Sequence, residues 1–105
     1  MKIVAVTACP TGVAHTIIAA RAIEKAAMSL GYQVKVEKQG ALGIQNRLTQ
    51  EDIESSDVVV FAVEQKVVED ERFRNKIIYT VPVNAPIING VDVLKSALKL
   101  IGKNK

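Results

Sequence analysis

Four short runs of β-branched and aliphatic residues recur along the chain, separated by segments of different periodicity. Their length and composition predict β-strands at Lys2 to Thr7, Gln33 to Glu37, Asp57 to Val63 and Lys76 to Val81. The run from Val58 to Val63 is apolar at every position. Continuous apolarity is typical of a strand buried on both faces of a sheet, so we expect this strand to be central.

Three segments between and after these strands predict helices, the two longer ones because apolar residues recur every three or four positions. They run from about His15 to Leu30, from Thr49 to Ser55 and from Val91 to Ile101. In the short second segment, Thr49 and Asp52 have the spacing of a capping-box variant. Gly31 and Gly102 follow the two longer segments, where glycine commonly ends a helix.

Strands that alternate with helices predict the α/β class and a parallel sheet. We expect one domain over residues 1–105, with an open four-stranded sheet in the order 2-1-3-4 and helices on both faces, as in flavodoxin-like and Rossmann-like folds. In that order, the connections after strands 1 and 3 leave in opposite directions. Open α/β sheets bind ligands at such a topological switch point, so the residues that follow Thr7 are expected to lie at a site.

Composition narrows the classes of function. With 105 residues and 49% hydrophobic residues, the chain can bury a core without disulfides or metal. One cysteine and one histidine exclude a disulfide framework and a Cys/His zinc site, so we expect no metal and no cofactor, and a reducing cytoplasm suits the lone thiol. A net charge of +3 and 4% aromatic residues indicate no nucleic-acid surface, while attraction to an acidic protein surface stays open.

The apolar runs are too short for a membrane segment. The longest, Val58 to Val63, has the length of a strand, whereas a bilayer requires roughly 18 to 20 residues. The string Val6 to Cys9 loosely resembles a lipoprotein cleavage box, but the apolar region before it, Ile3 to Val6, is shorter than the roughly 7 to 15 residues of a signal peptide. We therefore expect a soluble chain with no direct membrane insertion.

The only cysteine lies between the first predicted strand and the first predicted helix, in TACPTGVAHT (Thr7 to Thr16). A helix N-terminus favours a thiolate through its dipole and unpaired amides, and the same amides can bind an anion. Pro10 fixes its own φ and Gly12 lets the backbone approach an anion. We expect Cys9 to be the nucleophile and His15 to carry a proton or charge, and the candidate phosphate-binding residues are Pro10, Thr11, Gly12, Val13, Ala14, His15 and Thr16.

Several interpretations of this loop remain open on the residues alone. Cysteine phosphatases also use a thiolate before a helix, but they carry an arginine six residues after the cysteine, where this chain has His15. Cys9 is also compatible with a buried core residue or a redox thiol, although the chain has no second cysteine to resolve it. A binding module regulated by phosphorylation is a further possibility.

The string ACPTGVAHT closely resembles the phosphocysteine loop of the fructose-family IIB components of the bacterial phosphoenolpyruvate-dependent sugar phosphotransferase system (PTS). Similarity extends to VKVEKQG (Val34 to Gly40), GIQNRLTQEDI (Gly43 to Ile53) and ERF (Glu71 to Phe73). The corresponding family strings are VKVETQG and GIENxLTxEDI. This chain departs from them at Lys38, at Gln45 and in the segment Glu64 to Asp70.

The resemblance implies a two-step phosphoryl relay. Cys9 would accept the group from a phosphohistidine on a IIA protein and pass it to fructose or a similar sugar bound by the membrane component IIC. The chain would then be a type-2 EIIB domain and a protein-phosphocysteine sugar phosphotransferase. We expect a monomer in the cytoplasm, associated with the inner face of the membrane through IIC.

Polar residues beyond the other strands each have a functional and a structural interpretation. Arg72 either reaches the phosphoryl group or pairs with Glu69 or Glu71. The acidic run of Glu69, Asp70 and Glu71 would repel phosphate, which favours a solvated loop. The other candidates for a wall of the site or a partner contact are Gln39, Gly40, Val13, Ile44, Asn46 and Arg47.

Overall fold

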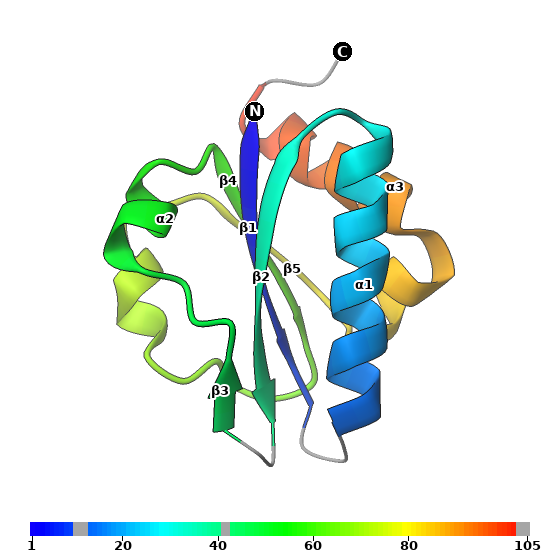
Figure 1. Cartoon of the computed structure of the whole chain (residues 1–105). Coiled ribbons are helices and arrows are strands. Elements are labelled where there is room, and N and C mark those ends of the chain that lie inside the picture. The colour runs from blue at the N-terminus through cyan, green and yellow to red at the C-terminus, as the bar shows by residue number, and fades with distance from the viewer. Residues whose placement is uncertain (10–12, 41–42, 103–105) are drawn as a thin grey trace.

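The computed structural model describes residues 1–9, 13–40 and 43–102, with only the backbone of residues 13 and 14. Helices pack against both sides of a twisted sheet (Figure 1). In chain order the elements are β1 (Lys2–Ala8), α1 (Val13–Ser29), β2 (Gln33–Gly40), β3 (Gly43–Gln45), α2 (Gln50–Glu54), β4 (Val58–Val63), the 3-10 helix η1 (Asp70–Phe73), β5 (Ile78–Val81) and α3 (Asn84–Leu100).

The sheet confirms the predicted class and the predicted order of the parallel strands. Its order is β3-β2-β1-β4-β5, and β1, β2, β4 and β5 run parallel to one another. These four strands are the ones predicted in the order 2-1-3-4. The central strand β1 places Ala5 between Val36 of β2 and Val60 of β4. The carboxyl ends of β1 and β4 therefore lie side by side at one edge of the sheet.

The predicted strand count was wrong by one. β3 pairs antiparallel with the end of β2, with Gln39 opposite Ile44 and Gly40 opposite Gly43. A strand of three residues is too short to show an alternating pattern, so its sequence carries no periodic signal. Gly43 has a φ of 92°, a left-handed conformation that a glycine adopts without strain.

α3 begins earlier than the predicted helix from Val91 to Ile101. It starts at Asn84 and contains one non-helical residue, Asn89, with φ −157° and ψ 89°. The side chain of Asn89 accepts a hydrogen bond from the amide of Asp92 at 3.0 Å, which resembles the start of a new helix. Pro86, Asn89 and Gly90 are usual helix breakers, so the sequence pattern revealed only the second half.

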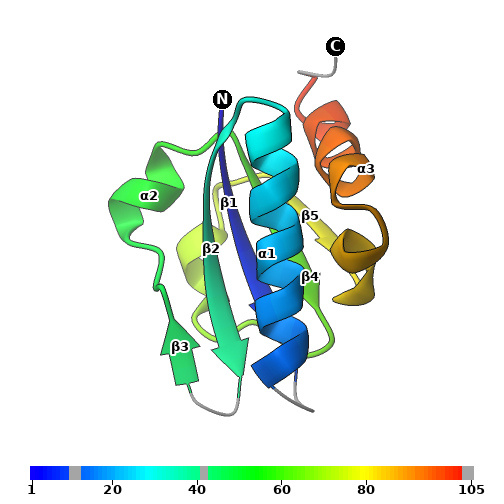
Figure 2. The same ribbon diagram turned by 45° about the vertical axis from the view of Figure 1, so that its right-hand side comes forward.

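Helices cover both faces of the sheet, as predicted (Figures 1 and 2). α1 and α3 pack together on one face over a core that includes Ile3, Val36 and Val60. On the opposite face, the elements α2 and η1 contribute Ile53 and Phe73 to a second core. None of the helices in the described part of the chain is long and apolar enough to cross a bilayer.

Candidate functional site

Cys9 lies directly after the last residue of the central strand β1, at the predicted switch point. Its side chain is buried, with 2% of its surface exposed, and α1 begins at Val13. The Cys9 Sγ atom is 3.9 Å from the Nδ1 atom of His15, which is exposed on the first turn of α1. The structure thus brings together the thiol and the imidazole that the sequence singled out.

The first turn of α1 is fixed to the central strand close to this pair. The hydroxyl of Thr7 donates a hydrogen bond of 3.1 Å to the main-chain carbonyl of Thr16, and both residues are buried. Of the predicted phosphate-binding residues, Pro10, Thr11 and Gly12 lie outside the described residues, and Val13 and Ala14 open α1. Phosphate binding by this loop stays a prediction.

The end of β2 borders the cysteine, as expected for Gly40. A Cβ atom built on Gly40 would lie 4.0 Å from the carbonyl oxygen of Cys9. The neighbouring residue, Gln39, pairs in register with Ala8 of β1. The segment after β4 approaches from the other side of β1, since the amide of Glu64 donates to the carbonyl of Ala8 at 2.8 Å.

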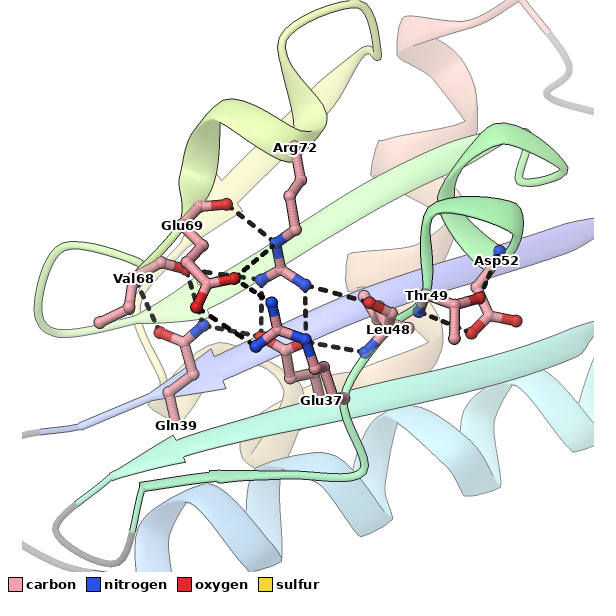
Figure 3. A network of polar contacts seen from close by, with 9 residues as sticks. Glu37, Gln39, Leu48, Thr49, Asp52, Val68, Glu69 and Arg72 are labelled. Carbon is pink, nitrogen blue, oxygen red and sulfur yellow. Dashed lines mark hydrogen bonds and ion pairs between the residues drawn. The ribbon is translucent and has the colours of Figure 1, made fainter.

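Arg72 binds a carboxylate that sequence reasoning missed, that of Glu37. Its Nη1 and Nη2 atoms donate to the two carboxylate oxygens of Glu37 at 3.0 Å and 2.9 Å. The arginine also donates to the main-chain oxygens of Leu48 and Glu69, at 3.1 Å and 2.9 Å (Figure 3). Glu37 is fully buried and the Arg72 side chain is 12% exposed. Arg72 thus has structural partners, but the predicted surface pairing with Glu69 or Glu71 was wrong about the main one: Arg72 pairs chiefly with the buried Glu37, and its Nε atom lies 3.9 Å from Glu69 Oε1.

Glu37 is held in its ionised form by its neighbours. Burial alone raises the pKa of a carboxyl group, but hydrogen bonds from Arg72, from the Leu48 amide and from Gln39 outweigh it and hold the pKa of Glu37 below its usual value. The alternation of β2 predicts Val36 inward and Glu37 on the opposite face. That face is covered by η1, which is separated from β2 in the sequence, so the pattern alone did not reveal that Glu37 is buried.

Asn46 and Arg47 have structural partners. Asn46 adopts a left-handed φ of 55°, and its side-chain amide donates to the carbonyl of Val36 at 2.9 Å. Arg47 forms an exposed ion pair with Glu69. Its hydrogen bond lowers the pKa of Glu69, and Glu69 raises the pKa of Arg47 in return. Within the acidic run, Glu69 is therefore not simply exposed to water, because its carboxylate forms an ion pair with Arg47.

Among residues 1–9, 13–40 and 43–102, no three His, Cys, Asp or Glu side chains lie close enough to hold a metal ion. The fold and the site together define a class of protein. It is a small open-sheet α/β domain that presents a single buried thiol, followed by a helix, at its topological switch point.

Comparison with known proteins identifies the family within that class. The family profile described as "PTS system, Lactose/Cellobiose specific IIB subunit" matches residues 4–96. The chain therefore belongs to the IIB family of the sugar phosphotransferase system. It is also 49% identical over 102 residues to the "PTS system fructose-like EIIB component 2" of Escherichia coli (strain K12), an alignment that covers 97% of this chain and 90% of that protein.

Solved structures of IIB domains have the same architecture. A domain from the fructose-specific IIABC component of Borrelia burgdorferi superposes with a TM-score of 0.89 at 46% identity, covering 93% of each chain. The Enzyme IIB subunit of the PTS system from Escherichia coli K12 superposes with a TM-score of 0.90 at 40% identity, covering 96% of this chain and 94% of that one. These comparisons confirm the family that the cysteine loop resembles.

Proposed function

We propose that this IIB component carries a phosphoryl group on Cys9 between a phosphorylated IIA protein and a sugar bound by a membrane component IIC. The observation that carries this proposal is the position of Cys9. The only thiol of the chain follows the central strand at the switch point, four residues before the start of α1 at Val13, and lies 3.9 Å from the His15 imidazole. The names of the relatives support fructose or a fructose-like sugar as the acceptor.

In the first step, the Cys9 thiolate attacks the phosphorus of a phosphohistidine. A sulfur–phosphorus bond forms and the nitrogen–phosphorus bond breaks, leaving the electron pair on the donor imidazole, while the thiol proton passes to that imidazole or to water. In the second step, a sugar hydroxyl attacks the same phosphorus. The sulfur leaves as a thiolate and the hydroxyl proton goes to a base or to water. A stabilised thiolate therefore helps both steps, as nucleophile and as leaving group.

The protein's contribution to such a transfer is positioning and electrostatic stabilisation, because negative charge is spread over the three phosphoryl oxygens. The N-terminal amides of α1 and the helix dipole favour an anion at this end of the helix. In this proposal, the amides of Thr11 to His15 and the hydroxyls of Thr11 and Thr16 bind the phosphoryl oxygens, while Pro10, which has no N–H, shapes the loop. His15 assists from beside the sulfur, as an imidazolium or as a hydrogen-bond donor.

Intact-mass measurement tests the first step. We expect incubation with phosphoenolpyruvate, the general phosphotransfer proteins and a matching IIA protein to add one phosphoryl group to the wild-type chain and none to the Cys9→Ser variant. Absence of labelling, or equal labelling of Cys9→Ser, would overturn the mechanism. Membranes that contain a matching IIC should then remove the label when sugar is supplied. Retention of the label there would instead favour a regulatory module.

A second assay separates the carrier from a cysteine phosphatase. The carrier should show no sustained turnover of a small aryl phosphate in the absence of IIA and acceptor sugar. Position 15 holds histidine, so the loop lacks the bidentate phosphate ligand that an arginine would supply there. Turnover of the aryl phosphate that is lost in Cys9→Ser would identify a phosphatase.

A further inference from the structure

The strings outside the cysteine loop that resemble the IIB family converge on one polar cluster, although the proposed chemistry uses none of them. Glu37 and Gln39 come from VKVEKQG, Leu48 comes from GIQNRLTQEDI and Arg72 comes from ERF. Figure 3 shows these residues meeting on the face of the sheet that carries η1. We refer to Glu37, Gln39 and Arg72 as the β2–η1 clamp.

Arg72 and Glu37 join three separate segments of the chain. The guanidinium of Arg72 binds both oxygens of Glu37 in β2 and the main-chain oxygens of Leu48 and Glu69. One oxygen of Glu37 also accepts the amide of Leu48 at 2.8 Å. Because a guanidinium is planar and its donors have fixed directions, one arrangement of these segments satisfies all of these bonds.

Gln39 extends the clamp to the edge of the sheet that carries the thiol. Its side-chain oxygen accepts the amide of Val68 at 2.8 Å, and its side-chain nitrogen donates to the carbonyl of Val68 at 3.1 Å and to Glu37 at 2.7 Å. Gln39 is 2% exposed and pairs with Ala8, the residue before Cys9. The segment 64–69 is thus bound near both ends, because the Glu64 amide donates to the carbonyl of Ala8 and the Val68 amide donates to the side chain of Gln39.

Backbone strain in this segment agrees with such a constraint. Glu69 has a φ of 61°, a left-handed conformation that is uncommon for a residue with a side chain. Its carbonyl accepts a hydrogen bond from Arg72 and its carboxylate pairs with Arg47. Strained residues of this kind persist where surrounding contacts fix them, and they occur frequently beside functional sites.

We propose that Glu37, Gln39 and Arg72 are positioning residues for phosphoryl transfer at Cys9. This inference rests on the proposed carrier function. The clamp holds the end of β2 on one side of Cys9, where a Cβ atom on Gly40 would lie 4.0 Å from the Cys9 carbonyl oxygen, and segment 64–69 on the other. Phosphoryl transfer depends on the alignment of donor, phosphorus and acceptor, so movement of these walls lowers the maximal rate while the thiol itself stays intact.

Gln39→Met is the informative substitution. Methionine has a similar volume and leaves the ion pair of Glu37 with Arg72 in place, but it removes both hydrogen bonds to Val68 and the one to Glu37. Val68 is 53% exposed and belongs to neither core cluster, so the domain should still fold. Glu37→Gln provides a second variant, which keeps an acceptor for the Leu48 amide and weakens the bond to Arg72.

Asp52→Asn is the matched control. Asp52 is also a carboxylate in ion pairs, with Lys2 and Lys35, and the hydrogen bond from Lys35 lowers its pKa. Lys2 begins β1, however, so this cluster lies toward the opposite end of the sheet from Cys9. The control therefore weakens a second set of carboxylate ion pairs, at a residue that is 20% exposed, without touching the walls of the site.

The experiment measures phosphorylation rates against IIA concentration at a temperature where circular dichroism shows every variant folded. We expect Gln39→Met and Glu37→Gln to lower the maximal rate about tenfold with an unchanged KM for IIA, and Asp52→Asn to change neither. Hydrogen exchange should be faster in residues 64–69 of Gln39→Met but not of Asp52→Asn.

The outcomes separate the two proposals. A labelled wild type with equal rates in all variants would overturn the positioning role and leave the carrier function standing. Equal slowing of Asp52→Asn and the clamp variants would also overturn it, since general destabilisation would then account for the effect. If hydrogen exchange in residues 64–69 is no faster in Gln39→Met than in the wild type, Gln39 does not hold this segment, and the positioning role is overturned whatever the labelling result. An unlabelled wild type would overturn the carrier function, and the positioning role with it.

Discussion

The substitution Arg72→Met tests how much the buried ion pair contributes to folding. Methionine keeps an unbranched stem against the ring of Phe73, whose centroid lies 5.0 Å from the guanidinium carbon of Arg72. The substitution removes both hydrogen bonds that the guanidinium donates to the carboxylate of Glu37, at 2.9 Å and 3.0 Å. Glu37 stays fully buried and loses its positive partner.

Removing one partner of a buried ion pair typically costs about 3–5 kcal/mol, because an uncompensated charge remains in the interior. A domain of this kind is stable by about 5–15 kcal/mol, so this loss is a large share of the total. With a urea m-value of about 1.5 kcal/mol/M for a small domain, the expected shift in the unfolding midpoint is about 2 to 3 M.

The loss should depend on pH. In the wild type the pKa of Glu37 is lowered, so its stabilisation is present above the pKa of the unfolded chain and is lost as pH falls through the folded value. In Arg72→Met, burial dominates and raises the pKa of Glu37 above the unfolded value of about 4.3. The folded variant then protonates Glu37 as pH falls. The gap in unfolding free energy between the two proteins should therefore be largest near neutral pH and narrow toward acid.

Urea unfolding at pH 7 and at about pH 4.5, followed by circular dichroism, measures both effects. Arg47→Met is the control, because its ion pair with Glu69 is exposed, and we expect its midpoint to stay close to that of the wild type. The double variant Glu37→Met with Arg72→Met should recover much of the loss, since no buried charge then remains. A loss below about 1 kcal/mol at neutral pH, or a gap that does not narrow in acid, would refute this account of the pair.

Three further substitutions probe other parts of the fold. Gly90→Ala should lower the free energy of unfolding in urea by about 1–3 kcal/mol, because a Cβ atom at this position of α3 would lie 2.8 Å from the Ala22 carbonyl oxygen of α1. A stability equal to that of the wild type would show that α1 and α3 can separate without loss. Thr49→Ala should cost about 1 kcal/mol through the capping box with Asp52, and no change would mean that the cap contributes nothing. His15→Ala should slow both half-reactions without abolishing either, and unchanged rates would make His15 structural.

The parallel part of the fold could be predicted because its signals are local. The run Val58 to Val63 is buried as expected, apart from partial exposure at its last residue, and the strand order follows from the right-handed connections. The capping box of Thr49 with Asp52 is present as its spacing predicts. Cys9 and His15 meet because they flank one strand-to-helix turn, so a local motif placed them near each other.

Features that depend on contacts distant in sequence could not be predicted. β3 was missed for a different reason, because it pairs with the neighbouring end of β2 but has only three residues, too few to show an alternating pattern. Glu37 is buried only because η1, more than thirty residues later, covers that face and supplies Arg72 at a separation of 35 residues. The alternation along β2 places Glu37 on the face opposite Val36, but it carries no information on what covers that face.

The pair of Glu37 with Arg72 fixes the orientation of the segments that it joins more than it stabilises the fold. A buried ion pair loses so much hydration that apolar residues of similar volume often stabilise a fold as well or better. Apolar residues would not, however, fix the orientation of the segments they touch, whereas Arg72 binds acceptors from Glu37, Leu48 and Glu69 at once. The transfer proposed at Cys9 depends on alignment, and these directional contacts reach the thiol's end of β1 through Gln39, which bonds to Glu37 and pairs with Ala8. Under the proposed carrier function, Cys9 supplies the reactive thiol, and Glu37, Gln39 and Arg72 supply a fixed frame around it.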